Sequence, residues 1–127
     1  MDKPRILIVE DEIENQRYLK LILKKNYDTD FCDSKSLMFE LLIKNEYDSI
    51  IMDISLKNGY TGIDLITELK RKTEYKNIPI ICLSAHAYGE QRKKAEQLGA
   101  EAYLTKPVSN KVLLDTLEKL IVNASHK

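Results

Sequence analysis

Five short apolar runs, separated by segments that mostly carry helical periodicity, constrain the fold of this chain more than any other feature. The first, third and fourth runs are nearly continuous in aliphatic residues, as in strands buried on both faces, whereas the second and fifth are shorter and mixed, as at sheet edges. The runs are Arg5–Val9, Thr29–Cys32, Ser49–Met52, Ile78–Leu83 and Ala100–Leu104. Strands that alternate with helices, five of each, predict an α/β fold with a parallel sheet between two helical layers.

The helical segments differ in the strength of their pattern. The first carries a stripe formed by Ile13, Tyr18, Leu21, Ile22 and Lys25, and the last carries one formed by Val112, Leu113, Leu117, Leu120 and Ile121. Gly62 and Gly99 are expected at helix ends. The segment Tyr88–Leu98 has only Ala95 and Leu98 as clearly apolar residues. This segment is either a thinly docked surface helix or a helix kept exposed or mobile for a partner.

With five strands, the leading topology is the flavodoxin-like order 2-1-3-4-5 with right-handed crossovers. In such sheets ligands bind beyond the carboxyl ends of the strands, where the first and third strands lie side by side. The sequence has 127 residues and no linker-like segment, so we expect one domain over residues 1–127 and no effector domain.

Composition excludes several classes of function. Lys plus Arg and Asp plus Glu number 20 each, which argues against direct nucleic-acid binding and against a polybasic membrane anchor. The apolar runs are too short for a signal peptide or a membrane span, so we expect a cytoplasmic protein. Cys32 and Cys82 lie 50 positions apart inside apolar stretches and are expected to be buried, reduced thiols.

Acidic residues follow the first and third runs. Glu10, Asp11 and Glu12 come directly after the first run, where a dinucleotide-binding fold would have glycines, and Asp53 follows the third. Taken alone, the first group could complement a helix dipole and Asp53 could be a turn residue. Together they should converge at one sheet edge, which is tolerable if Mg²⁺ lies among them. A carboxylate there can also attack phosphorus.

Two further polar residues fall at the same edge. Ser84 follows the fourth run and could donate to a phosphoryl oxygen, although a serine in an ordinary turn would look the same. Lys106 follows the fifth run and could pair with phosphoryl charge, or it could be a solvated lysine. Pro107 could begin a helix or form a cis peptide bond.

At this point the sequence resembles the receiver domain of two-component response regulators, the CheY-like fold. The motifs that carry the resemblance are ILIVEDE (6–12), IIMDISL (50–56), IICLSA (80–85) and YLTKP (103–107). The resemblance implies that Asp53 accepts a phosphoryl group from a phosphohistidine. It also implies that Glu10, Asp11, Asp53 and the backbone carbonyl of Ser55 bind Mg²⁺.

The same resemblance assigns roles around the phosphoacceptor. Ser84 matches the switch hydroxyl, Lys106 the phosphate-pairing lysine and Tyr103 the aromatic residue that changes rotamer, and the Lys106–Pro107 bond is expected to be cis. The implied partners are a sensor histidine kinase or histidine phosphotransfer protein, and an unknown downstream protein. That protein would bind the surface formed by Tyr88–Leu98, the fifth strand and the last helix. The implied protein is a monomer or weak dimer without nucleic-acid or membrane binding, and it is not an enzyme beyond its own phosphorylation and dephosphorylation.

Departures from the family pattern concern the loop after the phosphoacceptor. Residues 57–62 lack the usual proline, and the following glycine comes one residue late. Ser55 and His86 occupy positions that tune the phosphorylation lifetime in the family, although His86 could also be a solvated loop residue. Two rivals remain, a haloacid-dehalogenase-type phosphohydrolase, which would need an acid at Ser55, and a pseudo-receiver that has lost phosphorylation. The chain could stand alone or belong to a larger kinase or regulator.

Overall fold

The computed structural model describes residues 3–55, 61–86 and 88–125. Within these residues, five strands alternate with five helices. The strands are β1 (Arg5–Val9), β2 (Asp28–Cys32), β3 (Ser49–Asp53), β4 (Ile80–Ser84) and β5 (Ala102–Thr105). The helices are α1 (Ile13–Leu23), α2 (Lys35–Lys44), α3 (Gly62–Arg71), α4 (Glu90–Leu98) and α5 (Asn110–Ser125).

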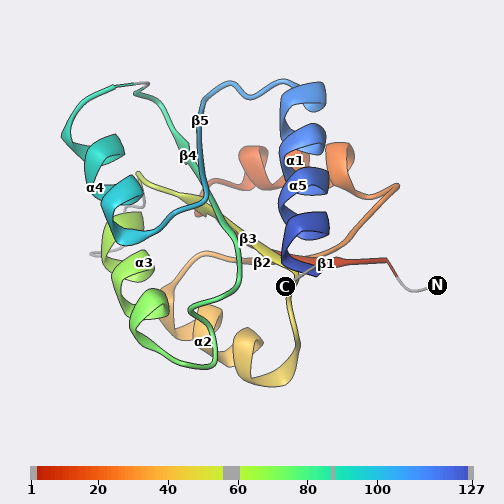
Figure 1. Cartoon of the computed structure of the whole chain (residues 1–127). Helices are drawn as coiled ribbons and strands as arrows, with labels where there is room; N and C mark the ends of the chain where they lie inside the picture. Colours follow the sequence, from red (N-terminus) through yellow and green to blue (C-terminus); the bar gives the residue numbers. More distant parts are fainter. Residues whose placement is uncertain (1–2, 56–60, 87, 126–127) are drawn as a thin grey trace.

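The sheet is parallel and has the order β2-β1-β3-β4-β5, which confirms the predicted topology (Figure 1). The central strands β1, β3 and β4 are almost wholly buried, as their continuous aliphatic sequences predict. The predicted bounds of β1 are correct, and those of the other strands differ by one or two residues at one or both ends. Asp53 and Ser84 are the last residues of β3 and β4, which confirms their predicted place at the carboxyl ends of these strands.

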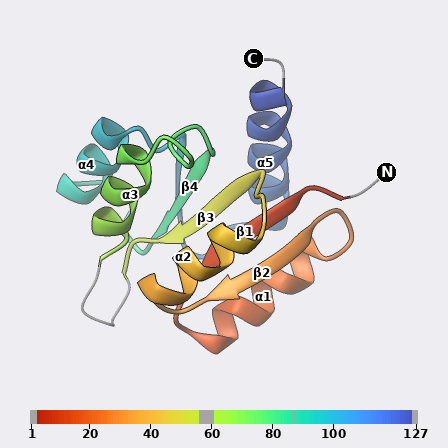
Figure 2. The same ribbon diagram turned by 90° about the horizontal axis from the view of Figure 1, so that it is seen from below.

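Helices cover both faces of the sheet (Figure 2). Buried side chains of α2, α3 and α4 form one core with alternate residues of the strands, and those of α1 and α5 form the second core on the opposite face. Cys32 and Cys82 are buried free thiols, as predicted. None of the helices in the described ranges is long and apolar enough to cross a membrane.

The predicted stripe of α1 was right at Ile22, which packs against the core, but wrong at other positions. Ile13 and Leu21 are 63% and 66% exposed, whereas Leu19 and Leu23 are buried against the sheet. The helix carries apolar residues of its own on several sides, so its sequence permits more than one apolar stripe at helical spacing. The packing against β1 and α5 selects the stripe that contains Leu19 and Leu23.

Local signals account for the helix boundaries. Ser34 caps α2 by accepting from Leu37 N, and Thr61 and Asp64 form a reciprocal capping box at α3. Gly99 ends α4 with a φ of 103°, a conformation in which glycine is favoured. Helix α4 buries only Ala95, so the sparse apolar pattern of this segment matches a thinly docked helix.

Candidate functional site

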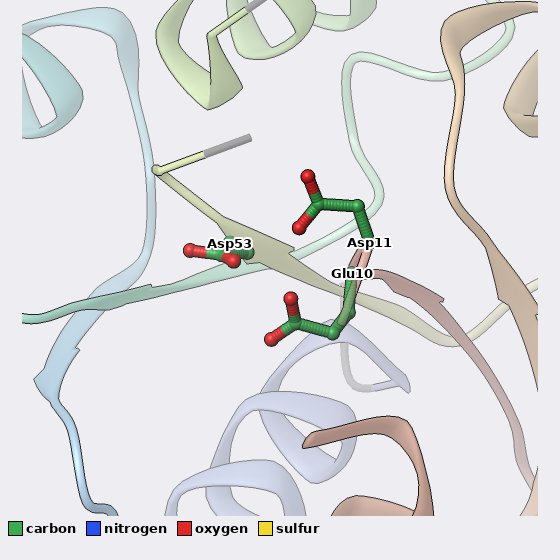
Figure 3. A group of neighbouring side chains, drawn as sticks. All are labelled: Glu10, Asp11 and Asp53. Atoms are coloured by element: carbon green, nitrogen blue, oxygen red, sulfur yellow. The ribbon is translucent and has the colours of Figure 1, made fainter. Parts of the chain in front are cut away.

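Three carboxylates converge at the carboxyl ends of β1 and β3. Glu10 and Asp11 directly follow β1, and Asp53 ends β3, which pairs with β1 through Val9 and Met52. Their carboxylates lie close together, and each offers an oxygen within 4.8 Å of the others (Figure 3). Glu10 and Asp53 are only 1% and 2% exposed. The structure therefore brings together the acid pair and the aspartate that the sequence placed at this edge.

Lys106 reaches the same carboxylates from the end of β5. Its Nζ lies 3.1 Å from Asp53 Oδ2 and 3.4 Å from Glu10 Oε1. Burial lowers the pKa of Lys106, but its contacts with Asp53 and Glu10 outweigh burial and raise the pKa above its ordinary value. The peptide bond between Lys106 and Pro107 is cis. Among the described residues, Lys106 is thus the cation paired with Glu10 and Asp53 at a group of three acids, which keeps an excess of negative charge.

The excess charge shows in the protonation of Glu10. Burial, followed by the hydrogen bond and the repulsion from Asp53, raises the pKa of Glu10 from 4.5 to about 7. The Glu12 N–H and the charge of Lys106 act in the opposite direction. Near neutral pH, Glu10 is therefore protonated for part of the time.

The same donor set suits a hard divalent cation. Mg²⁺ prefers oxygen ligands, and one or two carboxylates with water commonly hold it. A cation among Glu10, Asp11 and Asp53 would displace the proton of Glu10 and relieve the repulsion between the acids. The chemistry of these residues therefore fits Mg²⁺.

Backbone groups orient the carboxylates. Ser55 N–H donates to Asp53 Oδ1 at 2.9 Å, and Glu12 N–H donates to Glu10 Oε2 at 3.2 Å. The role predicted for the Ser55 carbonyl stays a prediction. Gln16 was not among the predicted site residues, but its Nε2 donates to the Glu10 carbonyl at 2.6 Å. The available signal was a long amide side chain in the first turn of the helix that follows the acid pair.

Gly62 brings helix α3 against the end of β3. A Cβ at this position would lie 2.5 Å from the carbonyl oxygen of Asp53 and 2.8 Å from Ile54 Cα. The Gly62 N–H also points to the Ile54 carbonyl at 3.3 Å. A glycine is therefore required where α3 begins. The remaining part of the unusual loop, residues 57–60, lies outside the described residues.

Ser84 and Tyr103 meet at the segment that follows β4. Ser84 is fully buried one step beyond Leu83, which pairs with Asp53, and its Oγ accepts from His86 N–H at 3.1 Å. The Tyr103 hydroxyl donates to the His86 carbonyl at 3.0 Å, and the Arg92 guanidinium lies 5.5 Å from the centre of the Tyr103 ring. The tyrosine ring is 9% exposed and therefore faces inward. His86 thus links β4 to β5, a connection that the sequence did not reveal.

The chain is similar in sequence to known proteins along most of its length. Residues 6–118 match the family model of the response regulator receiver domain. The chain is 30% identical to chemotaxis protein CheY-3 of Vibrio cholerae, over 91% of this chain and 90% of CheY-3. It is also 30% identical to the sensory/regulatory protein RpfC of Xanthomonas campestris, over 94% of this chain but only 17% of RpfC.

Solved structures agree with the sequence comparison. The receiver domain of the Pseudomonas aeruginosa sensor histidine kinase PA1611 superimposes with a TM-score of 0.84 at 28% identity, covering 94% of this chain and 98% of that domain. That structure contains a magnesium ion coordinated in its active-site cleft. The similarity extends over nearly the whole of both chains.

Proposed function

Because this chain belongs to the response regulator receiver domain family of two-component signalling, we propose that Asp53 accepts a phosphoryl group from a phosphohistidine in a Mg²⁺-dependent reaction. The observation that carries the proposal is the position of Asp53, held beside Lys106 at 3.1 Å and facing Glu10 and Asp11. The donor is a sensor histidine kinase or a histidine phosphotransfer protein.

The reaction is a transfer between two side chains. A carboxylate oxygen of Asp53 attacks phosphorus, the phosphorus–nitrogen bond of the donor breaks, and the donor imidazole leaves and takes up a proton. Phosphoryl transfer depends mainly on positioning and on stabilisation of charge. Lys106 neutralises charge on the phosphoryl oxygens, while Ser55 N–H holds Asp53 Oδ1 and Lys106 lies beside Oδ2.

A divalent cation completes this charge balance. When bound by Glu10, Asp11, Asp53 and the Ser55 carbonyl, Mg²⁺ would neutralise the acids and the transferred phosphoryl group. The chain acts only on its own aspartate, by this proposal, so it is a phosphoacceptor and not an enzyme with an external substrate.

The output is a change at the surface formed by α4, β5 and α5. The phosphorylated aspartate adds charge and strong acceptors, which draw in Lys106 and the Ser84 hydroxyl. Movement of Ser84 disturbs its contact with His86 N–H, and His86 also holds Tyr103. Helix α4 buries only Ala95, so its displacement sacrifices little packing. A downstream protein that binds this altered surface receives the signal.

The test is incubation with acetyl phosphate and Mg²⁺, followed by intact mass. We expect a phosphate-sized, base-labile gain that disappears in Asp53→Asn or with a chelator. Asp48→Asn is the matched control, because Asp48 is exposed and precedes the same strand at its opposite end. If Mg²⁺ binds but neither acetyl phosphate nor beryllofluoride modifies or occupies the wild-type protein, the pseudo-receiver alternative is correct.

A further inference from the structure

The connection between β1 and α1 is short and carries two of the three acids. Only Glu10, Asp11 and Glu12 separate the strand from the helix, and Glu12 is the N-cap of α1 without a side-chain capping hydrogen bond. Gln16 spans this connection from the first turn of α1.

Gln16 makes two bonds across this connection. Its backbone N–H donates to the Glu12 carbonyl at 3.0 Å, which is the first helical bond of α1. Its side chain reaches back over the start of the helix, and Nε2 donates to the Glu10 carbonyl at 2.6 Å. Gln16 therefore bonds to both ends of the connection, at the carbonyls of Glu12 and Glu10.

The carbonyl of Glu10 has a special place in the site. It belongs to the peptide unit that joins Glu10 to Asp11, and this unit is planar. Fixing its oxygen fixes the rotations on both sides, and hence the directions in which the Glu10 and Asp11 side chains leave the backbone. The Glu10 N–H donates to the Cys32 carbonyl at 2.9 Å, and the Glu10 carboxylate accepts from Glu12 N–H. The Gln16 amide is the contact that orients the peptide itself.

We propose that Gln16 is a positioning residue that orients the Glu10–Asp11 peptide and thereby sets the affinity of the acid pair for a divalent cation. The inference rests on the proposed function, in which this pair binds Mg²⁺. Gln16 itself contacts neither the cation nor the phosphoryl group. Groups that orient the ligands of a metal typically change its affinity by roughly 10–100-fold when they are removed.

The direct test is Mg²⁺ titration of Gln16→Met by isothermal calorimetry, without any phosphodonor. Methionine keeps the length of the side chain and removes the donor. We expect Mg²⁺ binding to weaken by roughly 10–100-fold, with an unchanged far-ultraviolet circular dichroism spectrum.

The matched control is Tyr18→Phe. Tyr18 lies on the same helix and donates to the Val108 carbonyl at 2.9 Å, so this variant also loses a side-chain hydrogen bond to a backbone carbonyl, but not one at the acid pair. A merely structural role for Gln16 predicts the same small fall in urea midpoint and the same Mg²⁺ affinity in both variants. The proposal predicts similar midpoints and weakened Mg²⁺ binding in Gln16→Met alone.

A measurement on the wild-type protein avoids any dependence on how the variant folds. In the presence of a chelator, the side-chain amide protons of Gln16 should exchange slowly with water in nuclear magnetic resonance spectra. Rapid exchange would overturn the proposal, and so would a Mg²⁺ affinity in Gln16→Met within twofold of wild type. A wild-type protein that binds no Mg²⁺ at all would refute the proposed function as well, which distinguishes the two failures.

Discussion

Removing the charge of Glu10 should stabilise the metal-free protein, and the gain should grow with pH. The pKa of Glu10 is raised from 4.5 to about 7 by burial and by Asp53. Between these values the folded state binds more protons than the unfolded state, so the free energy of unfolding falls as pH rises. The contribution is fully present below about pH 4.5 and is lost above about pH 7. Glu10→Gln has no such dependence.

The size of the effect follows from the displacement of the pKa. One pKa unit corresponds to about 1.36 kcal/mol, so the rise from 4.5 to about 7 sets a ceiling of ~3.4 kcal/mol. Lys106 Nζ lies 3.4 Å from Glu10 Oε1, and Glu10→Gln loses the attraction between these two charges, which reduces the gain in stability. Screening by water at the open end of the sheet reduces the value further. We therefore expect Glu10→Gln to be more stable than wild type by about 1–2 kcal/mol at pH 8.5 and to lose this advantage at pH 4.5.

The assay is urea denaturation of both proteins with a chelator at these two pH values. Glu40→Gln is the control, because the Glu40 side chain is 57% exposed and pairs with Lys44 on the same helix. The difference in free energy of unfolding between Glu40→Gln and wild type should change little between the two pH values. Saturating Mg²⁺ should remove or reverse the advantage of Glu10→Gln, since the cation binds only the folded wild-type site tightly. A stability difference that does not vary with pH would refute the reasoning.

Three other changes test neighbouring contacts. Gly62→Ala should lower the free energy of unfolding by about 1–3 kcal/mol in urea denaturation, because its Cβ would lie 2.5 Å from the Asp53 carbonyl; an unchanged midpoint would contradict this close approach. Tyr103→Phe removes the donor to the His86 carbonyl and should cost about 1 kcal/mol by the same assay, with no loss meaning that the bond contributes nothing. Lys106→Met should raise the pKa of Glu10 still further, measured from its carboxyl carbon by nuclear magnetic resonance with a chelator, and an unchanged pKa would show that the lysine charge has no effect there.

The sheet could be predicted because its signals are redundant. The central strands are continuous aliphatic runs, and their alternation with helices leaves few topologies. Once the order 2-1-3-4-5 is assumed, Glu10, Asp11, Asp53 and Lys106 must end at one edge, where the structure places them. The convergence of these side chains was therefore predictable, because strand order alone determines it.

The rest depends on packing and on side-chain reach, which no local pattern encodes. Ile13 and Leu21 fit a helical stripe as well as Leu19 and Leu23 do, and only contact with the sheet decides between them. The bond from Gln16 to the Glu10 carbonyl is of the same kind, because any polar residue of that turn could equally have faced solvent.

The depth of Asp53 has a consequence for the shape of any protein that donates to it. With 2% of its surface exposed, the aspartate cannot be touched by a flat partner surface. If Asp53 is the phosphoacceptor, the donor's reactive atom must project from the donor surface to reach it. Small soluble donors are free of this requirement, because they need no docking surface. A macromolecular donor must therefore first present a protruding reactive group. Matching of charge or apolar contact between the two surfaces comes after this requirement.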